Sequence, residues 1–134
     1  MPAHPPGPQK TLHEVAQQVG IYPPQAYEFI QEGLAFTVKR IHGTARKPDT
    51  TLHITGRQLC EGLRDLALLH WGKLSRVVLA RWNIHRTEDF GRMVFALVEA
   101  GHLHKTEADS FEDFRRVFDF AKVFEDSYSI ELKT

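Results

Sequence analysis

Apolar side chains recur at steps of three and four along most of this chain, which is the spacing of helices that bury one face. The spacing predicts helices over residues 12–19, 24–42, 58–71, 74–82 and 88–100, and a last helix that begins at Ser110. The clearest apolar stripe contains Tyr27, Ile30, Leu34, Val38 and Ile41. In the helix over 74–82, the spacing places these residues inward: Leu74, Val77, Val78 and Trp82.

Capping residues support several of these boundaries. Thr11 with Glu14, and Thr55 with Gln58, have the spacing of a capping box, in which two side chains satisfy free amides at a helix start. Thr87 is predicted to cap the helix over 88–100, and Asn83 to adopt a left-handed conformation after the preceding helix. Glycine follows four of the predicted helices, as it does at many helix ends.

Three short segments, 52–54, 102–106 and 128–132, are predicted as strands, two of them from alternating apolar and polar residues. The expected fold class is therefore mainly α with short β pieces. Residues 1–10 hold four prolines and a glycine and predict a flexible tail. The length of 134 residues fits a single compact helical domain over 11–134.

The centre of the chain has the order short helix, polar turn, longer helix, glycine and extended segment. This order resembles the winged-helix group of helix-turn-helix domains, and the resemblance covers about residues 56–106. Two features depart from that pattern. The turn is about one residue longer than usual, and Glu88 and Asp89 occupy the helix start, where carboxylates would repel a phosphate backbone. A plain helical core that enters no groove remains an alternative.

Charge is distributed unevenly along a chain that is neutral overall, with 17 basic and 17 acidic residues. Residues 39–92 hold eleven basic and five acidic residues, a net charge of +6, so the remainder carries −6. Such a basic middle suits nucleic acid or an acidic protein surface. The alternative is that the two kinds of segment pair within the fold. The predicted binding residues are Arg81, His85, Arg86 and Arg92, with Lys105 on the wing.

Enzyme and metal chemistry find less support. His102 and His104 have the spacing of two ligands on one side of a strand, and His85 or Cys60 would have to supply a third. Adjacent carboxylates on a helix diverge by about 100°, so neither such pair converges on a substrate atom. No cofactor motif is present. No apolar run approaches the roughly 20 residues of a membrane helix, and the N-terminus lacks a signal peptide, so we expect a cytoplasmic protein.

Four separated motifs resemble one family of proteins. They are Tyr22–Phe29, Leu59–Asp65, Arg86–Gly91, and Lys105-Thr106-Glu107 followed by Asp109. Together they resemble a family of short proteins of unknown function from planctomycete and verrucomicrobial bacteria, over nearly all of residues 11–125. The resemblance implies a single bacterial cytosolic domain and no particular activity.

The sequence therefore favours a non-enzymatic binding module, an adaptor or regulator with a basic helix-turn-helix-like surface. Its partner would be a nucleic acid or an acidic protein. In a protein–protein contact, Glu88 and Asp89 would take part directly. A small histidine-based metal protein and a purely structural homo-oligomer are the remaining alternatives, and the sequence does not decide the oligomeric state.

Overall fold

The computed structural model describes residues 10–43, 53–105 and 109–126. In chain order, the five α-helices of these segments are α1 (Leu12–Val19), α2 (Pro24–His42), α3 (Gly56–Trp71), α4 (Ser75–Arg81) and α5 (Thr87–Glu99). Three shorter helical turns are η1 (Gly72–Leu74), η2 (Phe111–Phe114) and the π-helical η3 (Ala121–Asp126). The prediction of a mainly helical chain is confirmed.

Local hydrogen bonds explain where several helices begin and end. The Thr11 hydroxyl accepts a hydrogen bond from the Glu14 amide at 3.1 Å, and Thr55 accepts one from the Gln58 amide at 3.0 Å. The carboxylate of Glu14 and the amide oxygen of Gln58 complete both predicted capping boxes. Asn83 has φ = 64°, as predicted for the end of α4.

Helices α2 and α3 approach closely because glycines lie at their contact. A Cβ on Gly62 would lie 1.8 Å from Thr37 Oγ1, and one on Gly33 would lie 2.1 Å from Leu63 Cδ2. The Thr37 hydroxyl is fixed, since it donates to the Gly33 carbonyl at 2.7 Å. Each glycine thus leaves space for a buried side chain of the other helix.

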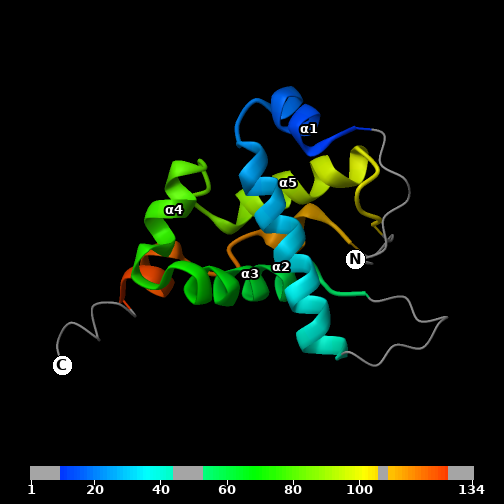
Figure 1. Cartoon of the computed structure of the whole chain (residues 1–134). Coiled ribbons are helices and arrows are strands. Elements are labelled where there is room, and N and C mark those ends of the chain that lie inside the picture. The colour runs from blue at the N-terminus through cyan, green and yellow to red at the C-terminus, as the bar shows by residue number, and fades with distance from the viewer. Residues whose placement is uncertain (1–9, 44–52, 106–108, 127–134) are drawn as a thin grey trace.

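Helix α5 is the central element of the fold. It packs against α1, α2, α3 and η2, and Figure 1 shows α2 passing in front of it with α3 below. Its apolar side chains Phe90, Met93, Val94 and Leu97 are each 0% exposed, and Val98 is half-buried. Only Arg92 and Glu99 are exposed on this helix. Helix α5 therefore presents no continuous face that could enter a DNA groove.

The wing and the predicted strands over 52–54 and 102–106 are wrong for the residues that the structure describes. No strand is present in residues 10–43, 53–105 or 109–126, and His53 takes part only in an isolated bridge. After α5, the Gly101 amide donates to the Val98 carbonyl and the His102 amide donates to the Leu97 carbonyl. These two bonds turn the chain back onto the helix, and Leu103 is buried. A winged-helix centre over 56–106 is therefore excluded by its missing wing, although the order α3, α4, turn and α5 is present.

Two further expectations are corrected. The predicted helix from Ser110 consists of the separate turns η2 and η3, and between them Arg116 has φ = 48°. Leu79 of α4 is buried, whereas Val77 of α4 and Leu74 of η1 are 56% and 55% exposed. A seven-residue helix offers too few turns for its apolar spacing to identify the inner face.

Several expectations lie partly outside the described segments. The predicted tail is described only at Lys10, and the predicted strand over 128–132 not at all. Among the described helices, none has the length and apolar character needed to cross a membrane.

Exposed charges also connect α2 with α3. Arg40 Nη1 lies 2.5 Å from Asp65 Oδ2, and Arg64 Nε lies 2.8 Å from Asp65 Oδ1. Burial alone would raise the pKa of Asp65, but the hydrogen bonds from Arg64 and Arg40 outweigh it and lower that pKa.

We predict that Gly62→Ala lowers the free energy of unfolding by about 1–3 kcal/mol, the usual cost of overpacking. The helix propensity of alanine acts in the opposite direction, so a loss would identify the steric contact with Thr37. Urea denaturation of Gly62→Ala, Thr37→Ala and the double variant measures this. The double variant should lose less than the sum of the single losses, and strict additivity would contradict the contact.

We predict that Asp65 makes stability depend on pH in acid. Its folded-state pKa lies below the unfolded value, so its contribution is present above that value and is lost as the pH falls through the folded pKa. Asp65→Asn should therefore lower stability at neutral pH and flatten its decline below about pH 4. Thermal unfolding from neutral pH into acid measures the difference, and parallel curves for the two proteins would refute it.

Candidate functional site

The turn between α4 and α5 is held rigidly at both of its ends. At the end of α4, the Asn83 amide donates to the Ala80 carbonyl and the Ile84 amide donates to the Leu79 carbonyl. The Asn83 side chain donates to the Ile21 carbonyl at 2.9 Å. The turn is therefore fixed to the loop between α1 and α2.

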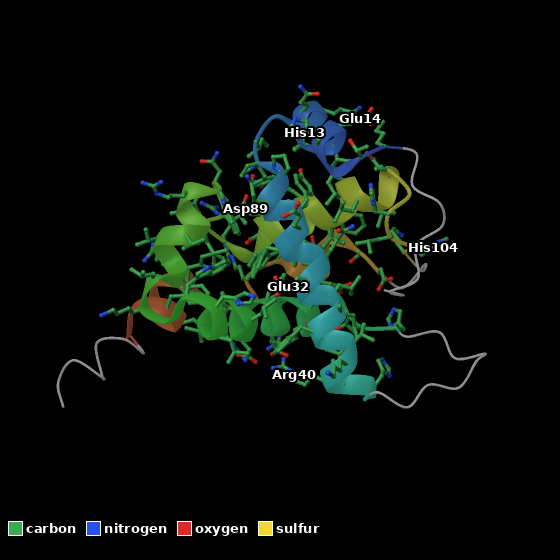
Figure 2. The ribbon with its side chains drawn as sticks, viewed as in Figure 1. His13, Glu14, Glu32, Arg40, Asp89 and His104 are labelled. Carbon is green, nitrogen blue, oxygen red and sulfur yellow. The ribbon has the colours of Figure 1, made fainter. Side chains whose placement is uncertain are left out.

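Asp89 holds the other end of the turn. Its Oδ2 accepts hydrogen bonds from the backbone amides of His85 at 2.8 Å and Arg86 at 3.2 Å. Its Oδ1 accepts from the Tyr22 hydroxyl at 2.5 Å and from Arg92 Nη1 at 2.9 Å. The carboxylate is 5% exposed, and in Figure 2 Asp89 lies between the ribbons of α2 and α4. Asp89 is thus a structural cap, and the prediction that it faces a partner is wrong.

The hydrogen bond from Tyr22 stays formed over a wide pH range. Burial, followed by the hydrogen bond to Asp89, raises the pKa of the Tyr22 hydroxyl well above its usual value. The phenol therefore remains protonated, and able to donate to Asp89, at neutral and moderately alkaline pH.

Thr87 fixes a second segment against the start of α5. Its hydroxyl donates to the Phe114 carbonyl at 2.6 Å and accepts from the Val117 amide at 3.2 Å. The N-cap position belongs to Arg86, so the predicted capping role of Thr87 is wrong. The buried Thr87 hydroxyl instead closes the turn 114–117, where Arg116 has its left-handed backbone.

These two fixed segments form the walls of an open cleft of about 510 Å³, which we call the α5 cleft. One wall is the start of α5 and the other is the segment after η2. The seven lining residues are His85, Arg86, Glu88, Arg116, Phe118, Asp119 and Phe120. Neither the Arg86 nor the Arg116 side chain forms an ion pair with another described residue. The cleft therefore presents two guanidinium groups and an imidazole to a ligand.

The aromatic part of the cleft is already engaged within the protein. The Phe118 ring stacks on Phe120 with a centroid distance of 5.5 Å, and Phe124 meets it edge-on at 6.1 Å. The guanidinium carbon of Arg64 lies over the same ring at 5.9 Å. Phe118 and Phe120 therefore supply an apolar floor and not a free stacking platform for a base.

The structure brings together only two of the five predicted binding residues. His85 and Arg86 line the cleft, whereas Arg92 binds Asp89 and Arg81 is exposed at the end of α4. Lys105 lies beyond the far end of α5, a helix of 13 residues and hence about 20 Å long. Arg116, Phe118 and Phe120 also line the cleft and were not predicted as site residues, although the run of arginine and phenylalanine over 114–120 was a signal.

The predicted metal ligands do not come together. The described residues contain no group of three or more His, Cys, Asp or Glu side chains that could hold a metal ion. His102 Nε2 donates to the Lys10 carbonyl at 2.5 Å, and Figure 2 shows His104 far from Asp89. Cys60 is fully buried, and this burial raises the pKa of its thiol. An inert thiol fits these surroundings better than a ligand or nucleophile.

Ion pairing within the fold removes part of the predicted basic surface. Among acidic residues of the central segment, Glu61 pairs with Arg57 at 3.7 Å, and Asp65 and Asp89 pair with arginines as described above. These ion pairs neutralise part of the positive charge of the central segment. Unlike the arginines in these pairs, Arg86 and Arg116 in the α5 cleft have no ion-pair partner among the described residues.

No family model, curated protein or solved structure matches this chain. The resemblance to the planctomycete and verrucomicrobial family stays a prediction, and function has to be inferred from the cleft.

We predict that Tyr22→Phe lowers the free energy of unfolding by about 1.5–3 kcal/mol, because it removes a hydrogen bond to a buried carboxylate. Tyr27→Phe is the matched control. Burial raises the pKa of Tyr27 to about 12, and its hydroxyl has no hydrogen-bond partner among the described residues. Tyr27→Phe should be neutral or slightly stabilising in urea denaturation. If both variants lose the same free energy of unfolding, the hydrogen bond from the Tyr22 hydroxyl to Asp89 does not stabilise the fold.

Proposed function

We propose that this chain is a non-enzymatic binding module and that the α5 cleft holds a negatively charged group of its partner. The observation that carries the proposal is the convergence of Arg86 and Arg116, from segments thirty residues apart in sequence, on one open cleft beside His85. Paired guanidinium groups suit carboxylate and phosphate ligands because their donors match the oxygen geometry. The walls are fixed by Asp89 and Thr87, so little ordering is needed on binding.

The composition of the cleft supports binding over catalysis. No hydroxyl or thiol side chain is among its lining residues, and His85 is the only imidazole among them. Nucleophilic catalysis requires such a group within hydrogen-bond reach of a base.

A protein partner fits better than a nucleic acid. Helix α5 is enclosed by its neighbours, and the Phe118 ring is already occupied, so neither groove insertion nor base stacking has support. Glu88 and Asp119 also line the cleft and would repel a continuous phosphate backbone. We propose a carboxylate-bearing protein segment as the partner and, with the sequence expectation, a cytoplasmic location.

The test is fluorescence anisotropy with three labelled probes: a short peptide rich in Asp and Glu, a single-stranded RNA and a duplex DNA. We expect the peptide to bind, and Arg86→Glu or Arg116→Glu to weaken it by at least about tenfold, or 1.4 kcal/mol. Lys39→Glu makes the same charge change on an exposed residue of α2 and should change affinity by less than about twofold.

A salt series separates the partner classes. A peptide that engages two arginines should show a shallow salt dependence, whereas a nucleic acid that contacts many phosphates shows a steep one. If RNA or DNA binds more tightly than the peptide, and with a steep salt dependence, the partner is a nucleic acid and not a protein. Equal effects of Arg86→Glu and Lys39→Glu would show that the cleft is not the site.

A further inference from the structure

Resting on the proposed function, we propose that the partner segment in the α5 cleft carries charges of both signs. Its carboxylate would bind Arg86 and Arg116, and its ammonium or guanidinium group would bind Glu88 and Asp119. The ligand class is thus a mixed-charge peptide segment and not a purely acidic one.

The arrangement of charge on the two walls carries this inference. The wall at the start of α5 holds Arg86 and Glu88, and the opposite wall holds Arg116 and Asp119. Each wall therefore presents one cation and one anion, and the four charges cancel. Among the described residues, none of the four forms an ion pair with another. Opposite charges thus share one cleft and each keeps capacity for a ligand.

The two carboxylates are placed by the protein. The Asp119 carboxylate accepts a hydrogen bond from the Ala121 amide at 2.8 Å, which fixes it before η3. Glu88 is half-buried in the first turn of α5. An acidic ligand drawn to the arginines would meet these carboxylates in the same cleft, where like charges repel at short range. A ligand cation beside its carboxylate removes that repulsion.

The size of the cleft sets the size of the ligand. A volume of about 510 Å³ accommodates a few side chains and not the face of a folded domain. Glu and Lys four residues apart on a helical segment lie on the same face, about 5–6 Å apart at Cβ, and so present both signs together. Phe118 and Phe120 would then contact the apolar stems of these side chains.

The experiment compares three labelled peptides of equal length in the same Ala and Gln background. One carries only Glu, one carries only Lys, and one carries Glu and Lys four residues apart. Anisotropy with the full chain should show the mixed peptide binding at least about tenfold more tightly than the Glu peptide, and the Lys peptide binding least.

Glu88→Gln tests the assigned cation site, and Glu99→Gln is its matched control at the exposed end of α5. Glu88→Gln should reduce the advantage of the mixed peptide to within about threefold, whereas Glu99→Gln should leave it unchanged. Thermal unfolding of each variant provides the folding control.

Each failure has a distinct meaning. If the Glu peptide binds as tightly as the mixed one, or if Glu88→Gln leaves the difference unchanged, the mixed-charge ligand is excluded and the binding module stands. If none of the peptides binds, the proposed function is overturned together with this inference. If the Lys peptide binds most tightly, the proposal that the two arginines bind a carboxylate of the ligand is wrong.

Discussion

The buried carboxylate of Asp89 is the interaction on which the arrangement of this protein depends. A carboxylate that is 5% exposed has to be hydrogen-bonded, because its desolvation would otherwise cost several kcal/mol. Its four donors come from the loop before α2, from the turn after α4 and from α5 itself. Satisfying one buried group therefore fixes the relative positions of three segments.

The α5 cleft follows from this constraint together with a second one. Asp89 fixes the backbone of His85 and Arg86, and the Thr87 hydroxyl fixes the segment from Phe114 to Val117 against the same helix end. Both anchors lie in the first turn of α5, but Asp89 fixes one of the two segments that line the cleft and Thr87 fixes the other. The polar groups that complete the helix start thereby also set the distance between the two walls, and this makes a preformed binding site the best-supported function.

The corrected role of α5 changes the class of partner. In a helix-turn-helix reader, the second helix is exposed along the face that enters the groove. Here that helix is the centre of the core, and its neighbours leave only Arg92 and Glu99 exposed along it. The residues that carry the functional argument are accordingly at the start of the helix and on the segment beside it. Opposite charges gather there, which suits a protein segment better than a polyanion.

The sequence by itself determined the helices, because their signals are local. The capping boxes at Thr11 and Thr55, the left-handed Asn83 and the apolar stripe of α5 each depend on residues within a few positions of one another. The exposed face of α4 could not be predicted, since a seven-residue helix is compatible with more than one buried face.

Only the tertiary structure decided what the charged residues do. Asp89 and Glu88 are adjacent in sequence and chemically alike, yet one is a buried cap and the other lines the α5 cleft. The segment after Gly101 was predicted as a strand, but it has no partner strand among the described residues and folds back onto α5. The segment that carries Arg116 is held beside the cleft by the Thr87 hydroxyl, which accepts a hydrogen bond from the Val117 amide thirty residues later in the chain. Such roles depend on long-range hydrogen bonds and burial, and neither is encoded in the spacing of neighbouring residues.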